Sequence, residues 1–263
     1  MPDILEKNRL LTQLDRFGFG GALHFFDTTE STNDDAMRML REGVRPPFVV
    51  AAKRQTRGRG RLDRRWYSDE SATLCISTAV ELPSDSGLVS SFTVACGVEI
   101  CNALKRVFGA ELFLKWPNDL YSKRGGKIGG MLAELYVDGG ARSAVFGVGI
   151  NCFSAVGNLS APSGVLASMD CLESVCSREV SMNAVGAAVA VSALKAAGRV
   201  STRGLAADFS AFDWLRGRRM RLDVGGRIID GIACGIDDFG RIGISENGGS
   251  PQYYAAVEAF PAK

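Results

Sequence analysis

The chain has 263 residues, of which 46% are hydrophobic and 23% charged, and its formal net charge is +2. These values are ordinary for a globular protein with a substantial core, and the small net charge argues against a generally basic protein that coats nucleic acid. No apolar run reaches the roughly 18 residues of a membrane span, and the N-terminal stretch lacks a signal-peptide core. We therefore expect a cytoplasmic protein with no membrane partner.

The segment 30–43 predicts a helix with both ends marked. Ser31 or Thr32 can cap its start, and Gly43 follows its end. Beyond it the hydrophobic pattern predicts a mixture of strands and helices. In chain order these are strands at 48–54 and 73–82, a helix at 88–108, a short strand at 111–116, a hairpin over 119–139, a strand at 142–150, and helices at 182–197 and 203–213.

From Trp214 the pattern changes to short strands separated by turns, which predicts a small β-barrel. We therefore expect an α+β fold with two domains, residues 1–213 and residues 214–263. Strict βαβ alternation is missing, which argues against a doubly wound nucleotide-binding fold. The stretch around Gly126-Lys127 also fails the Walker A pattern, and GVGIN at 147–151 is too short for a dinucleotide-binding fingerprint.

The cysteines and the single histidine show no pattern typical of a metal site or a disulfide framework. The chain has seven cysteines and no C-x-x-C pair, so neither a structural zinc site nor a set of disulfides is expected. Scattered cysteines are typical of a reducing compartment. His24 lies upstream of every polar cluster, and we expect it to be structural.

The stretch KRQTRGRGRLDRRW, residues 53–66, carries seven basic side chains and one acidic one, Asp63. Glycines let backbone N–H groups approach an anion closely, and arginine presents a forked donor that matches phosphate or carboxylate oxygens. Trp66 adds a flat apolar surface at the end of the stretch. A loop that closes over a small anion is favoured, with a nucleic-acid contact and a solvated loop as alternatives.

Three further polar stretches carry candidate ligand-binding side chains, each with a structural alternative. In LKWPNDL at 114–120, Asn118 and Asp119 could form an Asx turn, or they could read a base edge and hold Mg²⁺. Lys127 stands between glycine pairs, where a ligand can approach or where a lysine simply protects a sheet edge. The Ser-Thr-Asn run at 31–33 offers more hydrogen-bonding side chains than a helix cap needs.

Taken together and in this order, these stretches resemble the motifs of the biotin protein ligase family. The matching stretches are STN at 31–33, GRGR at 58–61 with Trp66, KWPNDL at 115–120, KIGG at 127–130 and GVGIN at 147–151. The resemblance implies a catalytic domain with a mixed β-sheet packed against helices, followed by a small SH3-like β-barrel. It implies an ATP-dependent ligase that forms biotinyl-5′-AMP and transfers biotin to a lysine of a biotin carboxyl carrier protein. A lipoate or octanoate ligase or transferase of the same superfamily is the alternative.

The resemblance also implies roles for individual positions. The catalytic pair is Lys127 and Arg61, which would meet the biotin carboxylate and the α-phosphate. The biotin-binding residues are Ser31, Thr32, Asn33, Gln55, Gly58, Arg59, Gly60, Arg61 and Lys127. The ATP-binding residues are Arg59, Arg61, Arg64, Trp66, Asn118, Asp119, Lys127 and Asn151, with Asp119 also the candidate ligand of Mg²⁺.

These residue types suit the implied chemistry. A carboxylate that attacks a phosphate brings two anions together, so cations must neutralise the developing charge. No histidine base is needed, because a carboxylate is already ionised at neutral pH. Residues 53–66 are expected to act as a mobile, water-excluding lid over the hydrolysable anhydride.

Two residues depart from the family pattern, Arg57 where a small residue is usual and Asp63 where a glycine is usual. We expect them to affect how tightly the adenylate is retained rather than which reaction occurs. Only about 22 residues precede the first motif strand, so no helix-turn-helix domain and no DNA partner are expected. The sequence leaves the oligomeric state open, a homodimer being one option.

Overall fold

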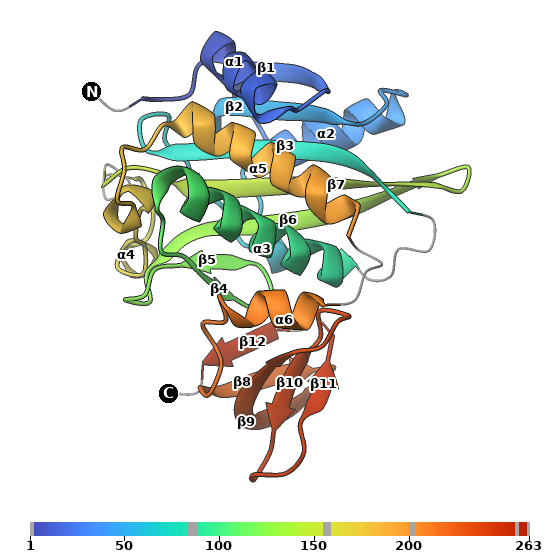
Figure 1. Ribbon diagram of the computed structural model, residues 1–263, viewed down its shortest axis with the longest axis vertical. Coiled ribbons are helices and arrows are strands. Elements are labelled where there is room, and N and C mark those ends of the chain that lie inside the picture. Colours follow the sequence, from blue (N-terminus) through green and yellow to red (C-terminus); the bar gives the residue numbers. More distant parts are fainter. Residues whose placement is uncertain (1–2, 84–88, 155–158, 200–203, 256–257, 262–263) are drawn as a thin grey trace.

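The computed structural model describes residues 3–83, 89–154, 159–199, 204–255 and 258–261 (Figure 1). The elements up to residue 151 are α1 (Lys7–Phe17), β1 (Ala22–Thr29), α2 (Thr32–Arg41), β2 (Phe48–Gln55), β3 (Thr73–Leu82), α3 (Val89–Phe108), β4 (Phe113–Lys115), β5 (Asp119–Tyr121), β6 (Lys127–Asp138) and β7 (Ala141–Asn151). They are followed by α4 (Ser163–Leu166), α5 (Met182–Ala197), α6 (Leu205–Ser210), β8 (Arg219–Val224), β9 (Arg227–Ile236), β10 (Ile242–Ser245), β11 (Gln252–Tyr254) and β12 (Glu258–Pro261).

Within these residues the strands form two sheets. The larger has seven strands in the order β1-β2-β3-β7-β6-β5-β4, and the smaller has five in the order β11-β10-β9-β8-β12. In the larger sheet β1 and β2 are parallel, whereas the other neighbours are antiparallel. A mixed sheet with helices and a second small antiparallel sheet confirms the predicted α+β fold.

The predicted elements recur in the structure with boundaries shifted by a few residues, as helix α2 illustrates. Ser31 caps it by accepting a hydrogen bond from the backbone N–H of Asp34, and Gly43 follows it at a φ of 87°. The helices α1 and α4 were not predicted. Helix α4 is only four residues long and leaves little signal in the sequence. Helix α1 does carry a signal that was missed, because Leu10 and Leu14 stand four residues apart on its buried face and Gly18 ends it at a φ of 79°.

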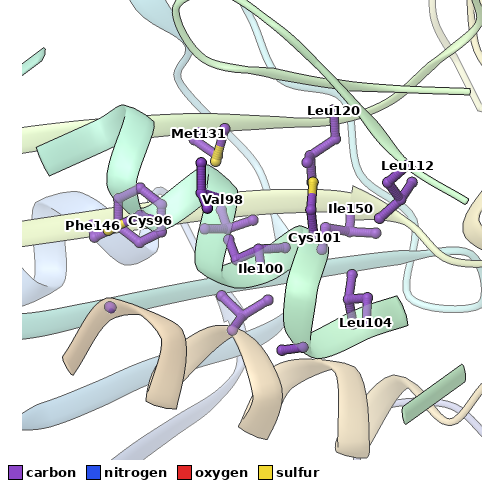
Figure 2. Close-up of a cluster of buried hydrophobic side chains, with 14 of the residues drawn as sticks. Cys96, Val98, Ile100, Cys101, Leu104, Leu112, Leu120, Met131, Phe146 and Ile150 are labelled. Atoms are coloured by element: carbon purple, nitrogen blue, oxygen red, sulfur yellow. The ribbon is translucent and has the colours of Figure 1, made fainter. Parts of the chain in front are cut away.

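The hydrophobic core lies on one face of the larger sheet, beneath α1, α3 and α5 (Figure 1). Figure 2 shows Cys96 of α3 beside Phe146 of β7, and Cys101 of α3 beside Leu120 of β5, within one buried cluster. Helix α5 is buried on nearly all sides, which explains its unbroken run of apolar and small residues.

The core extends into the smaller sheet. Met220, Leu222, Ile229, Ile242 and Ile244 are buried and belong to the same contiguous cluster as the side chains of α3 and α5. The division into residues 1–213 and 214–263 therefore stays a prediction. No helix among the described residues is both long and apolar enough to cross a membrane.

Alternation along β3 and β7 separates the core from a second, functional face of the sheet. Leu74 and Ile76 face the core, whereas Ser77, the next residue along β3, faces the other way, toward α2. On β7, Phe146 faces the core while Gly147 and Gly149 lie on the α2 face. Helix α2 packs on this second face and covers only part of it.

Candidate active site

The uncovered part of the second face forms a cavity of about 510 Å³. Its walls come from the start of α2, the loop after β2, the stretch between β4 and β5, and the start of β6, and β7 provides its floor. Fourteen ligand-binding residues were predicted, and all lie in the described part of the chain. Those that line the cavity are Ser31, Thr32, Asn33, Gln55, Arg59, Gly60, Arg61, Arg64, Trp66, Asn118, Asp119 and Lys127. Gly58 and Asn151 are not among the lining residues.

One end of the cavity is a buried polar network. Thr32 donates from its backbone N–H and its hydroxyl to Gln55 Oε1, at 2.7 and 3.0 Å. Ser77 Oγ lies 2.7 Å from Thr32 Oγ1 and 2.6 Å from Asn33 Oδ1. Ser31, Thr32, Asn33 and Ser77 are all buried, so this network fixes the direction of each donor and acceptor before any ligand arrives.

Two glycines of β7 make room on the cavity floor. A Cβ on Gly147 would lie 2.0 Å from Asn33 Oδ1, and one on Gly149 would lie 2.3 Å from Trp66 Cε2. Real Cβ atoms do not approach other atoms so closely, so both positions need glycine for close approach. The stretch GVGIN therefore forms the cavity floor, with Asn33 packed against Gly147 and Trp66 packed against Gly149.

The basic loop, residues 56–66 after the end of β2, is folded by its own backbone hydrogen bonds. Gly60 N–H donates to Arg64 O at 2.7 Å, and Trp66 N–H donates to Gly58 O at 2.9 Å. Gly58 is buried here, and a Cβ on it would lie 2.7 Å from Trp66 O. Whether the loop moves as a lid stays a prediction.

The arginines of the loop point in different directions. Arg61 Nη1 donates to Asn118 Oδ1 at 3.4 Å and so joins the loop to the stretch before β5. Arg59 contacts two carboxylates, Asp34 and Glu134. Arg57, the first departure from the family pattern, forms an exposed ion pair with Glu30 and does not line the cavity. The side chain of Asp63, the second departure, lies outside the described residues.

Lys127 stands at the opposite wall, and its ammonium group lies 2.7 Å from Asp119 Oδ1. Its backbone is held by residues 163–175, which we call the strap. Lys127 N–H donates to Ser168 O at 2.8 Å, and Lys127 O accepts from Asp170 N–H at 2.9 Å. The strap also lines the cavity with Val165 and Ser168.

Asn151 is fully buried behind this wall. Its Nδ2 group donates to Lys127 O and to Asp170 O, both at 3.2 Å, so these two carbonyls fix which end of the amide is the donor. Its Oδ1 atom has no hydrogen-bond partner in the described residues. A buried acceptor without a partner is an available site for a ligand donor.

Several lining residues had no predicted role. Lys115 donates to the Tyr121 hydroxyl at 3.1 Å, and burial lowers the pKa of Lys115 below its usual value. Trp116, on the same wall, donates from Nε1 to Gly240 O of the smaller sheet at 2.8 Å. Lys115 and Trp116 stand inside a recognised motif, whereas Val165 and Ser168 stand in a segment with no motif.

The amino-acid sequence matches a known protein family and several of its members. The model of the biotin/lipoate A/B protein ligase family matches residues 25–151. The chain is 31% identical over 254 residues to the biotin–[acetyl-CoA-carboxylase] ligase of Mycobacterium tuberculosis, covering 93% of this chain and 91% of that protein. It is 30% identical over 149 residues to the bifunctional ligase/repressor BirA of Escherichia coli, covering 56% of this chain and 44% of that protein.

Solved structures show the same fold. The biotin protein ligase of Aquifex aeolicus in complex with biotin and ATP has a TM-score of 0.77 at 21% identity, covering 93% of this chain and all of that one. The biotin acetyl coenzyme A carboxylase synthetase of Helicobacter pylori has a TM-score of 0.60 at 24% identity, covering 88% of this chain and all of that one. The identity of 31% to the Mycobacterium tuberculosis ligase, over more than nine tenths of both chains, shows that this chain belongs to the biotin protein ligase family.

Proposed function

We propose that this protein activates biotin with ATP and transfers it to a lysine of a biotin carboxyl carrier protein. In the first step a carboxylate oxygen of biotin attacks the α-phosphorus of ATP, and pyrophosphate leaves with the electrons of the broken P–O bond. In the second step the neutral lysine amine attacks the acyl carbon of biotinyl-5′-AMP. An amide forms, AMP leaves, and the amine loses a proton to solvent.

The observation that carries the proposal is the combination of three kinds of side chain in a single cavity. It is lined by neutral hydrogen-bonding residues at Thr32 and Asn33, by cations at Arg61 and Lys127, and by the aromatic ring of Trp66. Biotin has a neutral ureido ring at one end and a carboxylate at the other, and ATP adds phosphates and a flat base. The volume of about 510 Å³ is within the usual range of ligand pockets, roughly 300–1,000 Å³.

We assign the ureido ring of biotin to the buried polar network. Ser31, Thr32, Asn33, Gln55 and Arg59 surround it in this proposal, since their donors and acceptors can match a neutral ring that has both. Gly60 lines the cavity, where its backbone can approach the ligand, and Gly58 stands behind it against Trp66 and Gln55. The carboxylate of biotin then lies near Arg61 and Lys127.

We assign the nucleotide to the wall that Trp66, Arg64 and Asn118 build, with Asn151 buried behind it. Trp66 provides a face for the base, and Arg64 and Asn118 lie on the cavity wall beside it. The buried Asn151 Oδ1 would accept a hydrogen bond from the exocyclic amine of adenine, which would satisfy an acceptor that otherwise has no partner in the described residues. Arg61 and Lys127 neutralise the α-phosphate as charge develops on it.

We propose Mg²⁺ as the metal of the reaction, with Asp119 as its protein ligand. No group of three or more metal-ligating side chains occurs in the described residues, but Mg²⁺ commonly binds through one or two carboxylates together with substrate phosphates and water. Asp119 lines the cavity on the nucleotide side and therefore fits this arrangement. When bound, the ion would neutralise charge on the phosphates. The cytoplasmic location, the carrier-protein partner and the absence of a DNA partner remain part of the proposal.

Biotin-dependent exchange of radiolabelled pyrophosphate into ATP tests the proposal, because exchange requires the first step to be reversible and enzyme-bound. We expect exchange with biotin and none with lipoate or octanoate. Exchange with lipoate or octanoate alone would overturn the choice of substrate. A salt-sensitive thermal shift with a DNA duplex, together with no exchange at all, would overturn the assignment as an enzyme.

A further inference from the structure

Glu134 is a carboxylate of β6 that stands directly behind the cavity wall. It does not line the cavity, yet it contacts two residues that do, Arg59 and Asn33. No role was predicted for Glu134, because in the sequence it is one polar residue of a predicted hairpin with no pattern that marks it. A negative charge beside a site that binds anions weakens that binding, unless the charge is neutralised by a contact that helps to build the site.

Arg59 uses that charge to join three elements. Its Nη2 group lies 2.9 Å from Glu134 Oε2 and 3.1 Å from Oε1, and it also pairs with Asp34 at the start of α2. The basic loop is thereby tied to β6 and to α2 through one guanidinium. Partial burial alone would lower the pKa of Arg59, but the two carboxylates raise this pKa above its usual value.

The pair of Arg59 with Glu134 differs in exposure from another ion pair of the loop, Arg57 with Glu30. The side chains of Arg59 and Glu134 are 40% and 27% exposed, whereas those of Arg57 and Glu30 are 76% and 66% exposed. Exposed pairs contribute little because solvent screens them, and a less exposed pair with two contacts contributes more. Glu30 therefore offers a matched control for Glu134.

Glu134 also orients Asn33. Glu134 Oε2 accepts a hydrogen bond from Asn33 Nδ2 at 2.8 Å, while Asn33 Oδ1 lies 2.6 Å from Ser77 Oγ. These two contacts fix both ends of the amide. The same carboxylate thus sets the direction of a cavity-lining amide and the position of the loop.

We propose that Glu134 is a positioning residue that latches the basic loop closed through Arg59 and aligns Asn33 for the ligand. The inference rests on the proposed function for its effect on biotin and its adenylate. The latch itself is a property of the ligand-free chain. Closing the loop by contacts within the chain lowers the ordering cost that ligand binding would otherwise carry.

Limited trypsin digestion of the ligand-free protein tests the latch independently of activity. The loop contains five arginines between residues 57 and 65, and cleavage there requires local opening. We expect Glu134→Gln, which is isosteric but neutral, to speed cleavage within the loop about tenfold. Glu30→Gln should change it less than about twofold. Fragment masses identify cleavage at these arginines.

A second measurement follows release of biotinyl-5′-AMP from the preformed complex. Glu134→Gln should release it about tenfold faster and raise the KM for biotin, while kcat at saturating substrates changes less. Glu134→Asp keeps the charge and should recover part of the loss. Asp34→Asn removes the other carboxylate and should act in the same direction, which keeps the test valid if Glu134→Gln folds poorly.

The outcomes separate the latch from the proposed function. Equal cleavage of the loop in Glu134→Gln, Asp34→Asn and Glu30→Gln overturns the latch, whatever the parent protein catalyses. If the parent protein shows no biotin-dependent exchange, the proposed function fails while the digestion still decides about the latch. If the loop is cleaved faster but release of the adenylate is unchanged, Glu134 does not position ligand contacts and the inference is wrong.

Discussion

The two walls of the cavity are built on different principles. The basic loop at 56–66 has backbone hydrogen bonds to residues 29 and 30 at its start. Beyond these, side chains join it to its surroundings, with Arg59 on two carboxylates and Arg61 on Asn118. The strap at 163–175 holds the opposite wall largely through its backbone, which pairs with both the N–H and the C=O of Lys127. Side-chain chemistry leaves motifs in a sequence, whereas backbone support leaves almost none.

The largest effect is expected at Lys127, on the wall that the strap holds. Lys127→Ala removes the cation that neutralises the developing charge, so we expect formation of biotinyl-5′-AMP to slow by about 100- to 1,000-fold. Pyrophosphate exchange measures this rate, and biotin binding should be partly retained. Lys123→Ala, an exposed lysine in the adjoining turn, is the control and should change little. Near-normal exchange in Lys127→Ala would remove this lysine from the mechanism.

Arg61 tests the loop wall. Arg61→Gly removes a charged contact between the loop and Asn118, so biotinyl-5′-AMP should escape about 10- to 100-fold faster. The released intermediate can be followed by chromatography after rapid filtration. Arg57→Gly should behave like the parent protein, contrary to the expectation from sequence that Arg57 affects retention, because its side chain forms an exposed pair with Glu30 and does not line the cavity. An Arg61→Gly variant that retains its intermediate normally would show that the loop wall does not seal the site.

Gly147 tests the floor between the walls. Gly147→Ala places a Cβ about where Asn33 Oδ1 now lies, so the asparagine must move and the KM for biotin should rise about tenfold or more. The KM for ATP should change less. Gly20→Ala is a matched control, because no atom lies within 4 Å of the added Cβ. Equal KM values for biotin in the two variants would contradict the placement of the ureido ring.

Asp170 tests the strap, and the expected effect is the smallest. Its carboxylate accepts hydrogen bonds from Ser174, Cys171 N–H and Arg124. Asp170→Asn should therefore slow adenylate formation about tenfold or less, and raising the ionic strength should affect this variant no more than the parent. Loss of adenylate that grows steeply with salt would show that the strap depends on ion pairs, as the loop does.

The pH dependence of stability gives Asp170 a second test. Burial alone would raise its pKa, but hydrogen bonds from Ser174, Ser122 and its other partners lower it below 3.8. A carboxyl whose folded pKa is lowered stabilises the fold above its unfolded pKa and loses that contribution as the pH falls through the folded value. The difference in denaturation midpoint between the parent and Asp170→Asn should therefore be constant near neutral pH and shrink below about pH 4.

The contrast between the walls also explains what the sequence could predict. The capped helix α2, the strands flanking the basic loop and the hairpin of β5 and β6 follow from local patterns, because caps, alternation and turn residues are local signals. The convergence of Thr32, Arg61 and Lys127 on one cavity does not follow from those patterns, and family resemblance alone brought them together. Their roles in binding biotin and ATP stay predictions.

What remained hidden depends on contacts distant in sequence. Glu134 meets Arg59 across 75 residues, and Lys127 meets the strap across about 40, so neither pairing has a local signature. The floor role of Gly147 and Gly149 depends on which face of β7 they occupy, and a glycine in a strand does not reveal what approaches it. The buried helix α5, in contrast, was predicted over residues 182–197, because its signal lies within its own sequence.

The hydrogen bond from Trp116 to Gly240 makes the position of the nucleotide wall depend on residues 214–263. The indole of Trp116 is buried, and its N–H donates to a carbonyl in the turn between β9 and β10. A shift of that turn would therefore leave a buried N–H without an acceptor. A substitution in the turn should therefore be tolerated during evolution only when the tryptophan changes with it. Chimeras that exchange the smaller sheet between relatives should lose activity unless both partners of this bond are exchanged together.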